Sequence, residues 1–149
     1  QQLQVKHRLG KLPVEHRLRA EQRFLHNLDS PLRQLAEGYT HQNRVRYRAM
    51  VTVPLSRQAL NTGKIEPGTF FLTANNEIFF NFGRSVQKNV FDQNRLSAGV
   101  GYQVHPTANV QVGYLNQYLQ KADGVRFEKN HTLTLSVFYT VALSRLFGF

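Results

Sequence analysis

Charged and apolar side chains alternate with a period of two residues between Val14 and Phe24. The odd-numbered positions of this stretch carry Glu15, Arg17, Arg19, Glu21 and Arg23. Because successive side chains of a β-strand point to opposite faces, a strand collects all five charges on one face, whereas a helix would scatter them. The same register returns at Arg44, Arg46 and Arg48. The alternation therefore predicts an all-β protein whose strands share one charged face.

Seven segments of the chain show this alternation and are separated by turn signals such as Ser30-Pro31 and Asp123-Gly124. They run from Gln2 to Leu9, Val14 to Leu28, Thr40 to Leu55, Thr69 to Gly83, Asn94 to His105, Thr107 to Tyr118, and Glu128 to about Leu143. Several are about twice the usual strand length of about 5–6 residues, which suits a tilted membrane strand with an overhang. No stretch resembles a domain linker, so we expect a single domain over residues 1–149.

The polar faces of the segments differ in side-chain size. Early segments carry large charged groups, whereas the fifth carries Ser97, Gly99 and Gly101 and the last carries Thr132 and Ser136. Bulky arginines across from small residues suit the crowded interior of a small closed barrel. The opposite faces are apolar, and aromatic residues recur near segment ends, as at two membrane interfaces. We therefore expect an antiparallel up-and-down transmembrane β-barrel of about eight strands.

A soluble β-sandwich, or a lipocalin-like barrel that binds a small ligand, is the alternative, because either would also alternate, with the apolar face inward. The long segments and the arginines of the proposed inner face favour the membrane barrel. No run of residues approaches the ~18 apolar residues of a membrane helix, and the N-terminus lacks the apolar core of a signal peptide. The absence of cysteine excludes disulfides and a thiolate zinc site.

The formal net charge of +10 raises nucleic acid as a possible partner. Binding a single strand needs aromatic rings beside basic residues on one exposed face, and here the two kinds of residue mostly lie on opposite faces. We therefore expect no nucleic-acid partner.

The sequence predicts no catalytic, cofactor-binding or metal site. No close pair of histidines has the spacing of metal ligands, and His16 and His131 fall in the apolar register. A barrel lipase needs serine, histidine and carboxylate on one rim, whereas Ser136 and His131 are an odd number of residues apart and so point to opposite faces. We expect a protein that is not an enzyme.

Hydrophobic residues alternate almost to the C-terminal residue, interrupted by Arg145. The alternating positions include Tyr139, Val141, Leu143, Phe147 and Phe149. This pattern resembles the C-terminal assembly signal of bacterial outer-membrane barrels. Together with the segments Glu15 to Phe24, Arg44 to Arg48, Asn75 to Phe79, Asn94 to Leu96 and Asn130 to Leu133, it makes nearly the whole chain resemble an uncharacterised family of Bacteroidota-type outer-membrane β-barrels.

This resemblance implies a location in the bacterial outer membrane, contact with its lipid, and handling by the barrel-assembly machinery; it brings no established activity. Such barrels end their last strand on the periplasmic side, which would make the turns Gly10 to Pro13 and His105-Pro106 periplasmic, with Ser56 to Pro67 as a long periplasmic connection. Single-chain bacterial barrels normally have an even number of strands. We therefore predict that at least one N-terminal strand is missing from this sequence, or that a partner completes the wall.

The proposed lumen holds seven arginines and three glutamates. They are Glu15, Arg17, Arg19, Glu21, Arg23, Arg44, Arg46, Arg48, Glu77 and Arg95. One interpretation is a polar plug, in which ion pairs fill a narrow barrel that serves as a structural or accessory subunit among membrane-protein partners; loss of Arg19 would then leave a glutamate unpaired. The other interpretation is a narrow anion-selective pore lined by the excess of arginine.

Overall fold

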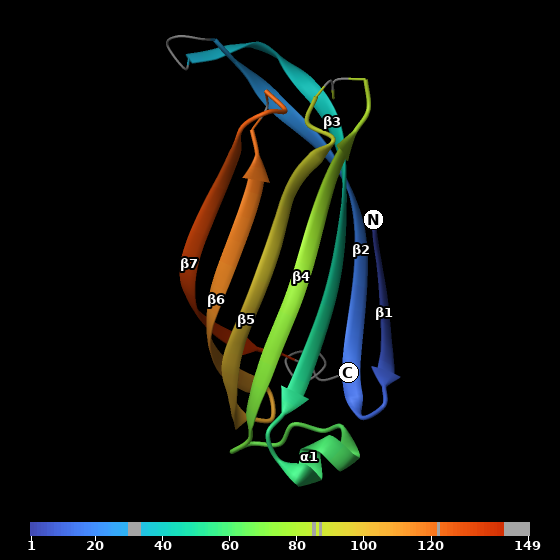
Figure 1. The fold of residues 1–149 in the computed structure, drawn as a ribbon, viewed down its shortest axis with the longest axis vertical. Helices are drawn as coiled ribbons and strands as arrows, with labels where there is room; N and C mark the ends of the chain where they lie inside the picture. The colour runs from blue at the N-terminus through green and yellow to red at the C-terminus, as the bar shows by residue number, and fades with distance from the viewer. Residues whose placement is uncertain (30–33, 85, 87, 122, 142–149) are drawn as a thin grey trace, which may run out of the picture.

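The computed structural model describes residues 1–29, 34–84, 86, 88–121 and 123–141. Over these residues the chain forms one seven-stranded antiparallel sheet, in which each strand pairs with the next along the chain (Figure 1). The strands are β1 (Gln2–Leu9), β2 (Leu12–Asp29), β3 (Gln34–Pro54), β4 (Phe70–Phe82), β5 (Phe91–His105), β6 (Ala108–Gln120) and β7 (Phe127–Tyr139). The predicted all-β antiparallel fold is confirmed, and each of the seven predicted segments corresponds to one strand.

The hairpin of β2 and β3 is longer than the turn signals predict. β3 begins at Gln34 rather than Thr40. The two strands continue to pair beyond a bulge between His26 and Leu28, as far as the pair of Asp29 and Gln34. In Figure 1 the end of this hairpin bends over the upper end of the sheet. The turn-forming residues therefore predict the position of the connection correctly, but the predicted connection is longer than the observed one.

The connection between β3 and β4, predicted without a helix, contains the short helix α1 (Arg57–Thr62). Ser56 caps its N-terminus by accepting a backbone N–H at 3.1 Å, and Gly63 ends it in the left-handed conformation with φ of 73°. Lys11 Nζ donates to Asn61 Oδ1 at 2.9 Å, so α1 lies beside the turn between β1 and β2. No helix among the described residues is long and apolar enough to cross a lipid bilayer.

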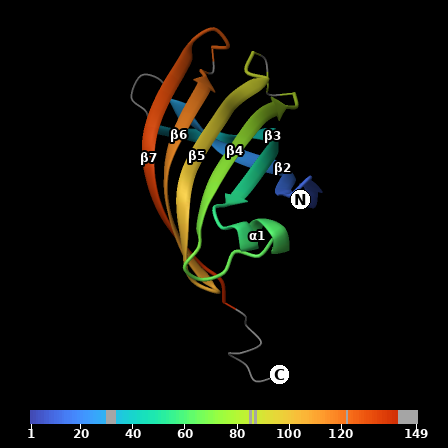
Figure 2. The same ribbon diagram turned by 60° about the horizontal axis from the view of Figure 1, so that its bottom comes forward.

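The two faces of the sheet differ in exposure. Phe79 and Asn81, on one face, are each 1% exposed, whereas Leu133 and Leu135, on the other, are 83% and 75% exposed. A single sheet buries side chains on one face by curling around them, and Figure 2 shows this curl. We call the face that carries Phe79 the inner face and the opposite face the outer face.

Small residues let the sheet curl at β5 and β6. The ring of the buried Phe71 lies over Gly101, where an added Cβ would overlap the ring. Gly99 and Gly113 pair across the two strands, and a Cβ on Gly99 would lie 2.7 Å from the carbonyl oxygen of Val112. Glycine at such positions permits close approach and sharper bending of a sheet. The small residues noted in the sequence thus shape the inner face.

The sheet is not closed into a barrel. β1 pairs only with β2 and β7 only with β6, so the outer edges of both strands are unpaired within the described residues. Alternate strands of an antiparallel meander run in the same direction, so β1 and β7 are parallel to each other. The predicted closed barrel of about eight strands is therefore not seen, because antiparallel closure of seven strands needs a further strand.

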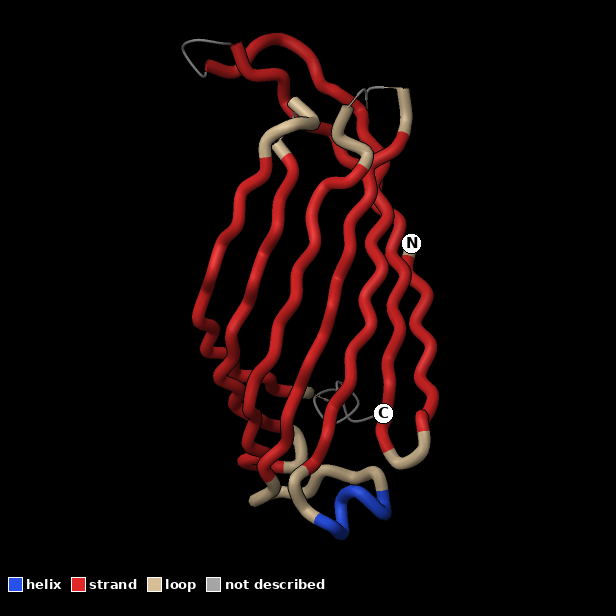
Figure 3. Tube along the Cα trace, viewed as in Figure 1, coloured by secondary structure: helices blue, strands red, loops and turns tan. Residues whose placement is uncertain are grey.

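The connections fall at two ends of the sheet. One end holds the β1–β2 turn, α1 and the β5–β6 turn, and the other holds the remaining three connections (Figure 3). β7 ends at the α1 end, where the N–H of Thr140 donates to the carbonyl of Thr107 at 2.8 Å. These are the two groups of connections predicted from the sequence.

Replacing Gly101 with alanine tests the packing of Phe71. The new Cβ would overlap the ring, and we expect the free energy of unfolding to fall by about 1–3 kcal/mol, the usual cost of overpacking. Equilibrium unfolding in urea measures the change. In a Phe71→Leu background the same substitution should cost less, and an equal cost in both backgrounds would show that the ring is not the obstacle.

Candidate functional site

The predicted charges lie together on the inner face. Glu21 pairs with Arg44 across β2 and β3, and Glu77 lies between Arg48 and Arg95 across β3, β4 and β5. Residues directly opposite each other share a face of the sheet. The register therefore places on the inner face all ten predicted residues, Glu15, Arg17, Arg19, Glu21, Arg23, Arg44, Arg46, Arg48, Glu77 and Arg95. We call this set the charge ladder.

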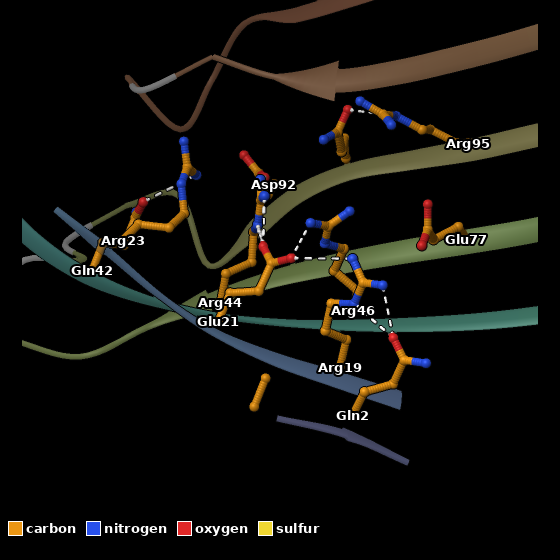
Figure 4. A network of polar contacts seen from close by, with 12 residues as sticks. Gln2, Arg19, Glu21, Arg23, Gln42, Arg44, Arg46, Glu77, Asp92 and Arg95 are labelled. Carbon is orange, nitrogen blue, oxygen red and sulfur yellow. Dashed lines mark hydrogen bonds and ion pairs between the residues drawn. The ribbon is translucent and has the colours of Figure 1, made fainter. Parts of the chain in front are cut away.

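Glu21 is the centre of one ion-pair group (Figure 4). Its Oε2 accepts hydrogen bonds from Nε and a terminal nitrogen of Arg44 at 3.1 and 2.8 Å, and its Oε1 accepts one from Arg46. Arg44 also donates to Asp92 Oδ2 at 3.3 Å. The four side chains are mostly buried, so this group joins β2, β3 and β5 through charge-assisted bonds.

A second group joins β1, β2, β3 and β4. Arg17 donates to Glu77 Oε1 at 3.2 Å from two strands away, and Arg48 donates to Glu15 Oε1 at 2.6 Å. The exposed Lys6 adds an ion pair to Glu15 at 3.5 Å. The prediction that the glutamates of this face need partners is met, as expected where charge leaves water.

Phe79 lies at the centre of the charge ladder. The guanidinium carbons of Arg44, Arg46 and Arg95 lie 5.3, 5.2 and 5.0 Å from the centroid of its ring. Cations within about 6 Å of a ring face are attracted by its quadrupole. Sequence reasoning missed this residue, although its position in the polar register of β4, between Glu77 and Asn81, could have revealed it.

Asp92 was also missed. Alternation places it on the outer face, because its neighbour Gln93 points inward. A β-bulge shifts the register here, since Phe79 pairs with Gln93 but Phe80 pairs with Phe91. The extra residue of β5, Asp92, can therefore reach the inner ion pairs. A bulge leaves no signal in the hydrophobic pattern, so the sequence could not have shown this contact.

Positive charge exceeds negative charge in this part of the inner face. Among the described residues, the seven arginines of the charge ladder have four carboxylates beside them, Glu15, Glu21, Glu77 and Asp92. Arg23 donates to Gln42 at 3.5 Å and Arg95 donates to Gln93 at 3.3 Å, and neither has a carboxylate partner in the described part of the chain.

Next to the charge ladder the inner face is uncharged and hollow. A hollow of about 160 Å³ is lined mainly by Thr73, Asn75, Ser97, Gly99, Gln111, Gly113, Thr134 and Ser136. The pair of Asn75 and Ser97 is the next inner pair along the register from Glu77 and Arg95. The inner face thus has a charged part and a part with room for several water molecules.

His16 on β2 and His131 on β7 lie on the outer face. His16 Nδ1 lies 2.7 Å from the Tyr47 hydroxyl, and His131 contacts the Tyr114 hydroxyl. Ser136 pairs with the inward-facing position of β6, so Ser136 and His131 lie on opposite faces as predicted. Within the described ranges, no three residues of the His, Asp and Glu types come together to hold a metal ion.

The predicted C-terminal signal lies only partly within the described residues. Tyr139, at the end of β7, and Val141 are exposed. Leu143, Phe147 and Phe149 lie outside the described residues.

An ionisable pair orders the connection between β6 and β7. Asp123 accepts hydrogen bonds from the backbone N–H groups of Arg126 at 2.9 Å and Val125 at 3.0 Å, and it also pairs with the Arg126 guanidinium. These bonds hold the pKa of the Asp123 carboxyl well below its usual value of 3.8. Because both side chains reach solvent, the pair stabilises a turn and does not extend the charge ladder.

Glu21→Gln should destabilise the protein far more than Arg19→Leu. Neutralising Glu21 leaves Arg44 and Arg46 without their shared carboxylate, and we expect a loss of about 3 kcal/mol in the free energy of unfolding. Arg19 lies 3.8 Å from Glu21 and donates its hydrogen bonds to Gln2.

Because Glu21 keeps two other arginines, we expect Arg19→Leu to cost less than about 1 kcal/mol, contrary to the sequence-based expectation. Urea unfolding of the two variants measures both losses. Equal losses would contradict the central position of Glu21.

Residues 1–128 match a family described as "Protein of unknown function (DUF2490)". No curated protein and no solved structure matches the chain. The resemblance to an uncharacterised family is therefore confirmed as far as the family's unknown function is concerned, while the outer-membrane barrel and the bacterial group remain predictions. Because the match covers most of the sequence, this chain belongs to the DUF2490 family of proteins of unknown function.

Proposed function

We propose that this protein is a transmembrane β-barrel of the bacterial outer membrane, acting as a structural or accessory subunit of an envelope complex with a charged, plugged lumen. The observation that carries the proposal is the arrangement of the two faces. The charge ladder lies on the inner face, and Leu133, Leu135 and Val137 are among the exposed apolar residues of the outer face. Soluble monomers rarely expose a contiguous apolar surface, whereas a bilayer is a solvent that suits one.

The apolar belt of the outer face has the height of a bilayer core. On β5 the outward positions from Leu96 to Val104 are aliphatic or aromatic, and Asn94 is the first polar one beyond them. Nine residues at about 3.3 Å each, tilted by about 40°, span roughly 23 Å. The apolar band of outer-membrane barrels is about 25 Å tall.

The border of this belt is staggered across the sheet. Outward positions become polar at His131 on β7 and at its partner Asn116 on β6. Counted from the level of His131 and Asn116, the outward positions become polar one position later on β5, at Asn94. They become polar three positions later on β2 and β3, at Gln22 and Asn43. Because barrel strands are tilted, a flat membrane boundary crosses successive strands at staggered registers. The stagger supports a tilted arrangement in a membrane.

Three polar side chains, His7, His16 and Asn76, fall inside the belt, and the rings of His7 and His16 stack with their centroids 5.0 Å apart. His16 contacts the Tyr47 hydroxyl at 2.7 Å, and Asn76 exchanges two hydrogen bonds of 3.1 Å with Asn94. A hydrogen-bonded polar group costs less in an apolar solvent than an isolated one. These exceptions are therefore compatible with a lipid-facing surface.

Aromatic rings mark both borders of the belt. At one border a row of rings crosses four strands through Phe80, Phe91, Tyr118 and Phe127, with centroid separations of 6.3, 6.4 and 4.9 Å. Towards the other border, the rings of Phe70 and Tyr102 lie 4.7 Å apart. Girdles of aromatic residues at the two interfaces are typical of outer-membrane barrels.

In this proposal at least one further antiparallel strand bridges β7 and β1. An unpaired backbone N–H or C=O group in hydrocarbon costs several kcal/mol, so the open edges of these strands need partners in a membrane. Since β1 and β7 run in the same direction, a single added strand is antiparallel to both. The wall then has eight strands, as expected from the sequence.

The barrel's own side chains plug its lumen. An eight-stranded barrel is just wide enough for its interior side chains, and Phe79 with its three arginines occupies the middle of the inner face. A plugged barrel acts through its surface and its loops. The partners we propose are outer-membrane lipid, other proteins of an envelope complex, and the barrel-assembly machinery during insertion.

Because the chain contains no tryptophan, a single introduced tryptophan can report lipid contact. Leu135, in the apolar belt, and Val125, in the β6–β7 connection, are 75% and 76% exposed and so form a matched pair. In vesicles that contain brominated acyl chains, fluorescence of Leu135→Trp should be strongly quenched and that of Val125→Trp weakly quenched. Equal quenching, or a monomer that stays soluble without detergent, would overturn the membrane proposal.

A narrow anion-selective pore is the second candidate, favoured by the excess of arginine over carboxylate on the inner face. Planar-bilayer recordings distinguish a plug from a pore: we expect no conductance at low or high salt, and anion-selective steps would favour the pore. The lipocalin-like alternative requires its apolar rows inside, whereas these rows lie on the outer face.

A further inference from the structure

Arg95 has unused hydrogen-bond donors. Its guanidinium carbon lies 5.0 Å from the Phe79 ring centroid, and its Nε donates to Gln93 Oε1 at 3.3 Å. The described arginine nitrogens that are buried without a hydrogen-bond partner belong to Arg46 and Arg48, so the terminal nitrogens of Arg95 are open to solvent. Within the described residues these two nitrogens have no hydrogen-bond partner, and Arg95 lies on the inner face.

Two amide side chains lie beside Arg95. Gln93 is 5% exposed, and its Oε1 accepts from both Arg95 Nε and Gln117 Nε2. Because the carbonyl oxygen of Gln93 serves both neighbours, its NH₂ group remains as a donor. Arg95 and Gln117 are direct cross-strand partners. Three neighbouring side chains thus bring together N–H groups from a guanidinium and two amides.

The carboxylates close to Arg95 in the strand register are engaged elsewhere. Glu77, its cross-strand partner on β4, accepts from Arg17 at 3.2 Å. Glu128, on the inner face of β7, is paired with Lys121. No described carboxylate therefore neutralises Arg95, and a partly buried cation without a counter-charge is unfavourable.

We propose that Arg95, Gln93 and Gln117 form a binding site for a compact oxyanion of the phosphate or sulfate type. A guanidinium group presents parallel N–H donors that match two oxygens of such an anion, and the amides add further donors. Chloride offers no such pair of oxygens, so the site prefers an oxyanion to chloride. The site uses only inner-face residues and therefore does not depend on the proposed membrane location.

Calorimetric titration of the purified full chain with inorganic phosphate tests the site, with sodium chloride at equal ionic strength as the reference. We expect one phosphate per chain, and Arg95→Gln should weaken the binding at least about tenfold, as loss of hydrogen bonds to a charged group predicts. Arg23→Gln is the matched control, because Arg23 is also a ladder arginine bonded to a glutamine. Its phosphate affinity should equal that of the unaltered chain.

Gln93→Glu separates loss of the site from a folding defect. It places a carboxylate of similar size beside Arg95, and phosphate binding should be lost while the circular dichroism spectrum and the urea midpoint are preserved. Undiminished phosphate affinity in Gln93→Glu or in folded Arg95→Gln would overturn the proposal. So would the absence of any phosphate heat beyond that of chloride in the unaltered chain.

Discussion

The sharing of Glu21 between Arg44 and Arg46, beside the ring of Phe79, is the interaction on which the rest of the inner face depends. Seven arginines on one face of a single sheet repel one another unless carboxylates and aromatic faces separate them. Through their side chains, the Glu21 group and the second group around Glu77 link β2, β3, β4 and β5 on the inner face. Curling the sheet around these contacts leaves the apolar side chains on the outer face.

The inner face also distributes side-chain volume unevenly. Large charged groups occupy β2 and β3, whereas β5 and β6 contribute Gly99, Gly101 and Gly113. An interior lined by large side chains on every strand would not fit a barrel of about eight strands. Phe71 and Gly101 are one example of a large side chain packed against a small residue, because the Phe71 ring fills the space that a Cβ on Gly101 would need. Charge pairing and volume matching therefore act together to set the curvature.

The sequence predicts most of the fold because period-two alternation determines both the strands and their faces. All ten ladder residues were identified in this way, and the register places them on one face. The partners within each ion pair could not be predicted in the same way. Glu21 forms hydrogen bonds with Arg44 and Arg46 rather than with Arg19, because the side-chain geometry across the strands decides which groups meet. α1 was missed because six residues contain too little periodicity, and Asp92 because a bulge changes its face without changing the pattern.

The bulge at Asp92 of β5, opposite Phe79 and Phe80, bears on how accurately the strands pair. Sliding one strand by a single residue would exchange its two faces. For β3 in the proposed membrane setting, such a slip would place Arg44, Arg46 and Arg48 against lipid, at about 2–4 kcal/mol each near the bilayer centre. The bulge interrupts the alternation of faces at one position only, and there it lets Asp92 join the ion pairs of the inner face. The charged side chains of the inner face therefore also disfavour a misaligned pairing of the strands.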